Sequence, residues 1–180
     1  MILRQFLHTD PVAISYLFGC GGKACAAVVD PVGDVGNVAV EVLHTPGHTP
    51  EHICLLVADR TRAAEPWGAL TGHTLMVGDV GRTELAMNAE EGARSLFRSL
   101  RRLKALPDYV EVLPGAYAGS VCGRGLSGKP ASTIGFEKRH NVTFRIADEE
   151  TFVASMLADI PPPPPRAREL RTSNAGWTVS

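Results

Sequence analysis

Long apolar runs, paired cysteines and an excess of one charge are all missing from this chain of 180 residues. No apolar run reaches the roughly 20 residues that a membrane-spanning helix needs, and the first residues carry no apolar stretch typical of a secretory signal. None of the four cysteines forms a Cys-x-x-Cys pair, which argues against a zinc-finger-type site. We therefore expect a cytoplasmic protein whose cysteines are free thiols or buried apolar residues.

The charge balance excludes further classes of partner. There are 18 basic and 19 acidic residues, and the net charge is -1. Nothing in this balance predicts binding to nucleic acid or to an anionic membrane surface. The apolar share of 44% and the charged share of 21% are typical of a soluble globular domain. A chain of this length can bury roughly two-thirds of its unfolded surface, so a core without disulfides is expected.

The order of the predicted elements indicates a layered α/β or α+β domain, because strand patterns fill the first half and helical patterns come later. Apolar runs bounded by glycine and proline predict strands at 12–18, 26–30, 38–43, 52–58, 69–77 and 109–113, the first two forming a hairpin. Apolar residues at helical spacing predict helices at 89–106, capped by Asn88, and at 149–160. Only these two helices are clear, fewer than a two-sheet sandwich with helices on both sides needs.

The end of the chain has a different character. Five consecutive prolines at 161–165 favour a stiff, extended spacer, and the residues after them have little capacity to form a core. The predicted organisation is therefore one domain over residues 1–160 and a proline-rich linker or tail over 161–180.

One short motif is a candidate for metal chemistry. Residues 45–49 read Thr-Pro-Gly-His-Thr and follow a predicted strand, so the proline and glycine fix a tight turn that aims His48. A neutral imidazole suits zinc or iron, although a lone histidine is more often structural. His44, His48 and His52 are spaced by four, as on one helical face, but Pro46 and the other turn residues between them exclude a helix. His44 and His52 are therefore predicted to be loop residues or residues that support a ligand.

The region around this motif resembles a metal-ligand loop of the metallo-β-lactamase superfamily. Further segments resemble its persulfide dioxygenase branch, which is glyoxalase II-like and often fused to rhodanese domains. The resemblance covers nearly the whole chain. The matching segments are the initial hairpin up to residue 32, then 44–52, 65–68, 71–75, 77–85, 113–116, 122–127 and 132–137.

The chain departs from the family pattern at most of the metal positions. The His-x-His-x-Asp-His cluster is absent, and its place falls between Asp34 and Val38. The segment expected as Gly-Asp-Thr-Leu has His73 at the carboxylate position, and the segment expected as Pro-Gly-His ends in Ala116. The resemblance therefore implies an incomplete αββα sandwich of α/β (α+β) class, metal ligands at His48 and His73, and weak or absent binding of iron or zinc.

The resemblance also implies substrate and partner properties. A small thiol such as glutathione persulfide is the expected substrate, with Arg82 and Arg124 binding it, because guanidinium groups suit the carboxylates of glutathione. For Arg82 a surface arginine after a glycine turn is the equal alternative. Two functions stay open: an impaired enzyme that acts on glutathione-linked sulfur substrates, and a non-catalytic pseudo-enzyme or gene remnant with a thiol-binding or docking role. The fusion to rhodanese domains in this branch implies a rhodanese-type partner. The shortened sheet predicts a homo-oligomer or an unstable monomer.

Overall fold

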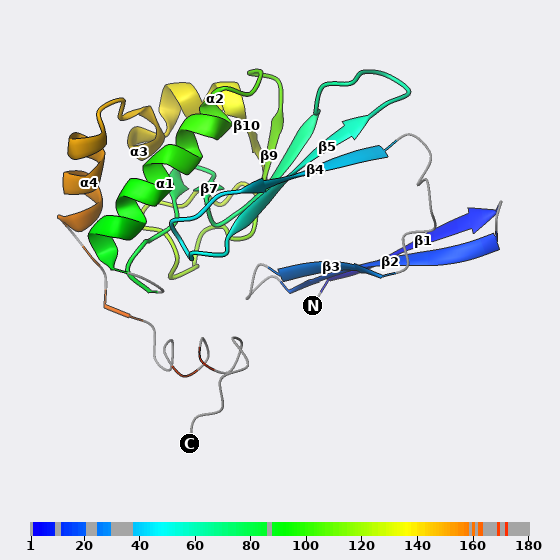
Figure 1. The fold of residues 1–180 in the computed structure, drawn as a ribbon, viewed down its shortest axis with the longest axis horizontal. Helices are drawn as coiled ribbons and strands as arrows, with labels where there is room; N and C mark the ends of the chain where they lie inside the picture. The colour runs from blue at the N-terminus through cyan, green and yellow to red at the C-terminus, as the bar shows by residue number, and fades with distance from the viewer. Residues whose placement is uncertain are drawn as a thin grey trace.

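The computed structural model describes residues 2–9, 12–20, 25–29, 38–85, 88–158, 160, 162–163, 169 and 172. Its main body is a five-stranded sheet with four helices (Figure 1). The strands of this sheet lie in the order β10-β9-β6-β5-β4. Their bounds are β4 Val38–His44, β5 Ile53–Asp59, β6 Gly68–Gly72, β9 Glu111–Pro114 and β10 Ser132–Thr133.

The sheet is mixed. β5 runs antiparallel to both β4 and β6, β6 is parallel to β9, and β10 is antiparallel to β9. A parallel pair needs a crossover connection, and the chain between β6 and β9 supplies it. That connection holds the two-stranded sheet of β7 Leu75–Met76 and β8 Asp79–Val80, followed by the first helix. A turn at residues 73–74 separates β6 from β7, so the strand predicted over 69–77 is divided into two.

A separate antiparallel sheet forms at the start of the chain. It joins β1 Ile2–Thr9, β2 Val12–Cys20 and β3 Cys25–Val29 in that order. The predicted hairpin of the second and third of these strands is confirmed, whereas the sequence pattern missed β1. Among the described strands, no pairing joins this sheet to the five-stranded one.

The described residues form four helices where the sequence predicted two. The predicted ones are α1 Ala89–Lys104 and α4 Glu149–Leu157. The missed ones are α2 Ile134–His140 and α3 Val142–Arg145, which are too short to show a clear apolar period. Side chains cap each of their first turns: the Thr133 hydroxyl accepts from the Phe136 N–H, and the Asn141 carbonyl oxygen accepts from the Phe144 N–H.

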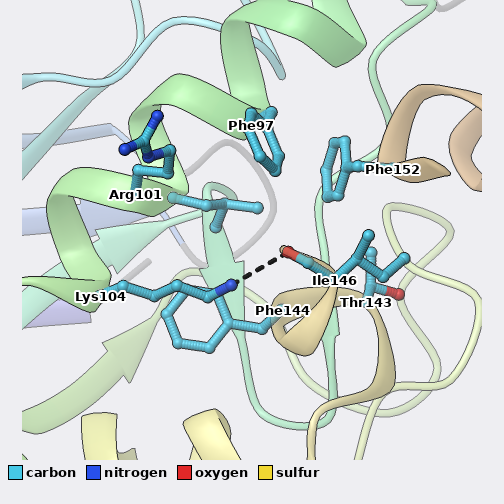
Figure 2. A pocket seen from close by; sticks show the side chains of 8 residues that line it. Phe97, Arg101, Lys104, Thr143, Phe144, Ile146 and Phe152 are labelled. Carbon is cyan, nitrogen blue, oxygen red and sulfur yellow. Dashed lines mark hydrogen bonds between the residues drawn. The ribbon is translucent and has the colours of Figure 1, made fainter. Parts of the chain in front are cut away.

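The core lies on one face of the five-stranded sheet, where α1 packs between the sheet and α4 (Figure 1). Phe97 of α1 stacks obliquely on Phe152 of α4, with ring centroids 5.4 Å apart. Next to this pair, the Lys104 stem crosses the Phe144 ring and its ammonium donates to the Ile146 carbonyl at 3.1 Å (Figure 2). These contacts join α1 to α3 and to α4.

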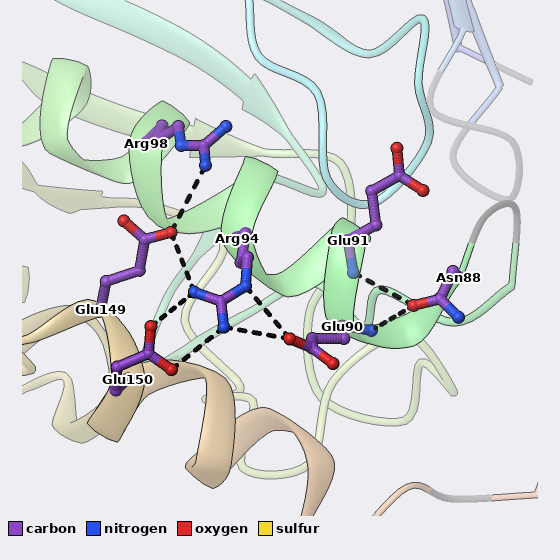
Figure 3. A network of polar contacts seen from close by, with 7 residues as sticks. All are labelled: Asn88, Glu90, Glu91, Arg94, Arg98, Glu149 and Glu150. Carbon is purple, nitrogen blue, oxygen red and sulfur yellow. Dashed lines mark hydrogen bonds and ion pairs between the residues drawn. The ribbon is translucent and has the colours of Figure 1, made fainter.

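Ion pairs reinforce the same helix layer from outside. Arg94 of α1 contacts Glu90 one turn earlier and both Glu149 and Glu150 at the start of α4 (Figure 3). Hydrogen bonds to Glu150 and Glu90 raise the pKa of Arg94. Such exposed pairs contribute little stability each, at most about 1 kcal/mol.

The predicted class, an incomplete sandwich of mixed α/β type, is confirmed. Most of the predicted linker at 161–180 lies outside the described residues, so the division at residue 160 stays a prediction. None of the described helices is both long enough and apolar enough to cross a membrane.

Candidate metal centre

The loop after β4 carries His48, and helix α1 holds this loop in place. Gly47 has a φ of +145°, and a Cβ on it would lie only 2.5 Å from the Leu96 backbone of α1. A side chain at this position would therefore push the loop away from the helix. Ser99 of α1 donates to the Pro46 carbonyl at 2.8 Å, and Arg102 donates to the His44 carbonyl at 2.7 Å. The proline-glycine pair thus does what the sequence predicted: it fixes the turn that orients His48.

His48 is buried and its ring is fixed in one tautomer. Its Nδ1 lies 2.7 Å from the Arg82 carbonyl oxygen. A carbonyl can only accept, so Nδ1 carries a hydrogen, and in the neutral ring Nε2 keeps a lone pair. This Nε2 lies 2.9 Å from Nδ1 of His73, and the two rings meet edge-on with centroids 4.6 Å apart. A donated Nδ1–H with a lone pair at Nε2 is the arrangement usual for histidines that bind metals.

His52 supports His73 from behind. The His73 backbone N–H donates to His52 Nε2 at 3.0 Å, so the hydrogen of His52 is on Nδ1, within 3.0 Å of the hydroxyls of Thr45 and Thr74. Burial, followed by the nearby His48, lowers the pKa of His73 to about 3 and the pKa of His52 to about 4. Both imidazoles are therefore neutral at physiological pH, which is the form that binds metals.

A close approach of two backbone segments brings His73 beside His48. A Cβ on Gly81 would lie 2.1 Å from the His73 carbonyl oxygen and 3.3 Å from His48 Nδ1. Only glycine leaves room there for the turn at 71–74 to lie against the segment at 81–83. Glycine at this position therefore helps to set the distance between the two imidazoles.

A third potential ligand, Cys122, lies beside the two histidines. One ligand atom from each of His48, His73 and Cys122 falls within 4.8 Å of the others. The Cys122 loop is tied to the Arg82 segment, because the Arg82 N–H donates to the Cys122 carbonyl at 3.2 Å. The Arg82 guanidinium also donates to the Val121 carbonyl at 3.1 Å. The sequence alone did not predict Cys122 as a potential ligand; the available signal was its place in the glycine-rich loop that follows the Pro-Gly-Ala segment.

The two arginines predicted to bind substrate are engaged within the protein. Arg82 is only 4% exposed, forms an ion pair with Glu84, and donates to backbone carbonyls of Val121 and Pro162. Arg124 is exposed, and its guanidinium reaches the Ser155 carbonyl and the Met156 sulfur. Substrate binding by either side chain stays a prediction, and for Arg82 it would require these contacts to break. The alternative of a surface arginine at position 82 is wrong, because the side chain is buried.

Three other residues of this region lie outside the cluster of His48, His73 and Cys122. Ala116, at the position of the last family ligand, is buried and offers no donor. His44 is exposed and its Nε2 bonds to the Pro50 carbonyl oxygen at 2.8 Å. The nearby Asp79 carboxylate accepts from the backbone N–H groups of Arg124 and Gly125, so it holds their loop in place. In the described part of the chain, the cluster of ligand atoms contains no carboxylate.

Known proteins resemble this chain over most of its length. An uncharacterized protein of Mycobacterium leprae is 35% identical over 76% of this chain and 59% of its own length. A hydroxyacylglutathione hydrolase of Shewanella halifaxensis is 33% identical over 62% of this chain and 39% of its own. A probable zinc-dependent hydrolase of polyketide biosynthesis from Bacillus velezensis is 28% identical over 84% of this chain and 61% of its own. No family model matches.

Solved structures agree with these relatives. A metallo-β-lactamase from Staphylococcus aureus superposes with a TM-score of 0.74 at 28% identity, covering 99% of this chain and 74% of that one. The chain resembles the metallo-β-lactamase superfamily in both sequence and fold. ETHE1 from Myxococcus xanthus, with a TM-score of 0.63 at 22% identity, covers 99% of this chain and 100% of that one, and shows the shared fold. The chain spans about half the length of the curated relatives it matches.

The residues present fit a single ion of the kind this superfamily binds. Zinc is held by histidine nitrogens at about 2.0–2.1 Å and by cysteine sulfur at about 2.3 Å, so two nitrogens on one tetrahedral ion lie roughly 3.3 Å apart. In this structure His48 Nε2 and His73 Nδ1 are hydrogen-bonded at 2.9 Å, so the two rings would separate slightly to admit the ion. Two imidazoles and one thiol match zinc in chemistry, whereas an iron site of the two-histidine, one-carboxylate type lacks its carboxylate here.

Proposed function

We propose that this chain is a metallo-β-lactamase-fold protein that acts on glutathione-linked sulfur substrates and is similar to persulfide dioxygenases and hydroxyacylglutathione hydrolases. We also propose that it is catalytically impaired in this shortened form. The substrate class is supported by the hydroxyacylglutathione hydrolases among its relatives. A zinc-dependent hydrolase among the relatives supports metal binding.

One observation carries the proposed impairment. In the cluster of ligand atoms, His73 stands at the family's carboxylate position, and its ring nitrogen bonds to the His48 ring nitrogen at 2.9 Å. A carboxylate ligand supplies negative charge and a second oxygen that can accept a proton beside the metal. A neutral imidazole supplies no negative charge, and once one nitrogen binds the metal the other carries hydrogen. Enzymes of this kind gain much of their rate from a metal that polarises the substrate and orients it.

Two turnover assays test this proposal. Oxygen consumption with glutathione persulfide, and hydrolysis of a glutathione thioester, should each equal the rate without enzyme, in protein loaded with iron and in protein loaded with zinc. A His48→Ala variant is the matched control, because it removes the one intact ligand of the family pattern. Turnover by the unmodified chain that disappears in His48→Ala would contradict the impairment.

A non-catalytic docking role is the second candidate, and the outer face of the sheet favours it. Val40 and Val42 of β4 and Ile53 of β5 are 56%, 60% and 47% exposed. Adjacent exposed apolar side chains of this kind often mark an interaction surface. A rhodanese-type protein is one such partner. Co-sedimentation with a purified rhodanese tests the role, and an unchanged sedimentation coefficient for both proteins would contradict that partner.

A further inference from the structure

His48 and His73 alone would give a metal ion only two protein ligands, and binding would be weak. The structure brings Cys122 to the same place from a loop distant in the sequence, with its ligand atom within 4.8 Å of theirs. Three protein ligands with a remaining open position are the number found in zinc sites that exchange water or substrate. A thiol in the set also changes which ions fit, because soft sulfur ligands select zinc over magnesium, calcium or manganese.

Several contacts keep these three groups together. The His48 ring is oriented by the Arg82 carbonyl, and the backbone N–H of Arg82 holds the Cys122 carbonyl. Residue 82 thus connects one histidine and the cysteine through its own main chain. The Ser120 hydroxyl accepts from the Cys122 N–H at 3.2 Å and fixes the loop on its other side.

The remaining histidine is held independently. His52 accepts the His73 backbone N–H, and the hydroxyls of Thr45 and Thr74 fix the His52 ring in turn. Contacts that orient ligands in this way are typical of sites organised before a metal arrives. The other described free cysteine, Cys54, is buried and bonds instead to the Thr45 hydroxyl and the Thr71 carbonyl.

We propose that Cys122 is a metal ligand and that His48, His73 and Cys122 together bind one zinc ion. The cysteine then takes the place of the ligands that this chain lacks, and the site holds a single ion with a sulfur donor. Binding displaces the thiol proton of Cys122 to solvent, so the bound ligand is the thiolate. His73 Nδ1 is the donor to the His48 Nε2 lone pair in this structure, so zinc binding at Nδ1 requires the His73 hydrogen to move to Nε2. The inference deepens the proposed function, because it concerns the same centre.

Cobalt substitution tests the thiolate directly. The full chain is freed of metal with a chelator and titrated with Co²⁺, and zinc affinity is then measured by competition. We expect one equivalent of Co²⁺ with an intense near-ultraviolet thiolate-to-cobalt charge-transfer band, which zinc abolishes. In Cys122→Ser the band should vanish and zinc affinity should fall by at least about 10-fold, the smallest loss usual even for residues that only support a ligand.

Cys54→Ser is the matched control and should keep the band. An unchanged band in Cys122→Ser, or a folded wild-type chain that binds no Co²⁺, would overturn the proposal. A measurement without mutation guards against misfolding of the variant: zinc should protect Cys122 of the wild-type chain from alkylation by iodoacetamide, read by mass spectrometry of the Cys122 peptide. Equal alkylation with and without zinc would also overturn the proposal.

Failure of this inference is distinguishable from failure of the proposed function. Turnover of glutathione persulfide by a chain that shows the cobalt band would contradict the impairment and leave the cysteine ligand supported. Absence of the band in a chain without turnover would leave the impairment supported and overturn the cysteine ligand.

Discussion

The two faces of the five-stranded sheet differ sharply, although the same strands form both. Directly paired residues of antiparallel neighbours lie on one face, so Leu43, Cys54 and Leu56 share the face covered by the helices, and all are buried. Val40 and Val42 belong to the opposite face and are more than half exposed. Apolar residues therefore occupy both faces of β4 and β5, but the described helices cover only one of them.

The residue pattern of these two strands is therefore typical of a sheet covered on both faces. A strand with one solvated face alternates apolar and polar residues, whereas a strand buried on both sides is apolar throughout. β5, with the sequence ICLLVAD, is of the second kind. β4 is also the last strand of its sheet among the described residues, so it presents an unpaired edge beside the open face.

The largest difference in the free energy of unfolding is expected between two variants, one that shortens a buried side chain and one that shortens an exposed side chain. Leu56→Ala should lower the free energy of unfolding by about 2–5 kcal/mol, because it removes packing and leaves a cavity. Val40→Ala, on the neighbouring strand but on the open face, should change it by less than about 0.5 kcal/mol. Urea unfolding followed by circular dichroism measures both. Similar losses for the two variants would show that the open face is covered in solution.

Self-association is the next expected effect. The open valines and the unpaired edge predict that the isolated chain forms dimers or larger assemblies, or melts as an unstable monomer. The double variant Val40→Lys/Val42→Lys should weaken the association by at least about 10-fold, or about 1.4 kcal/mol, as read by sedimentation at several concentrations.

Val142→Lys is the matched control for this experiment, because Val142 is 76% exposed but lies on α3, in the helix layer. It should leave the association unchanged. A monodisperse wild-type monomer with a sharp melt above about 65 °C, the upper end for ordinary mesophilic domains, would contradict the prediction.

A smaller effect is expected at the start of α1, on the covered side. The Asn88 side chain accepts hydrogen bonds from the N–H groups of Glu90 and Glu91. Asn88→Ala should therefore lower the free energy of unfolding by about 1 kcal/mol, whereas Asn88→Ser, which keeps a capping oxygen, should cost less. Thermal melts compare the two. Equal losses would mean that the cap contributes nothing to holding α1 against the sheet.

The smallest effect is expected for the ion pairs outside the helix layer. Arg94 is partly exposed, and its partners Glu90 and Glu150 are largely exposed. Arg94→Ala should change the free energy of unfolding by at most about 1 kcal/mol, and added salt should reduce the difference from the wild type. A loss as large as that of Leu56→Ala would show that this network, rather than apolar packing, joins α4 to α1.

Local patterns predicted most of the long elements. α1 begins at Ala89 as its cap indicated, and β4 and β5 fall within one residue of their predicted positions. The short elements α2, α3 and β10 were missed because a few residues carry no measurable period. β1 was missed as well, although it spans eight residues. For the short elements, capping side chains and contacts distant in the sequence decide the structure.

The turn that orients His48 could be predicted from the sequence alone, because Pro46 and Gly47 restrict the backbone locally. The sequence also determined that His44 and His52 cannot share a helical face with His48. Which other groups lie beside His48 depends on contacts between loops that are distant in the sequence. Cys122 approaches the histidines through a backbone bond to Arg82, and Arg82 itself is buried by contacts with Glu84 and with carbonyls far along the chain. Such contacts depend on how separate loops pack together, which no local pattern of residues encodes.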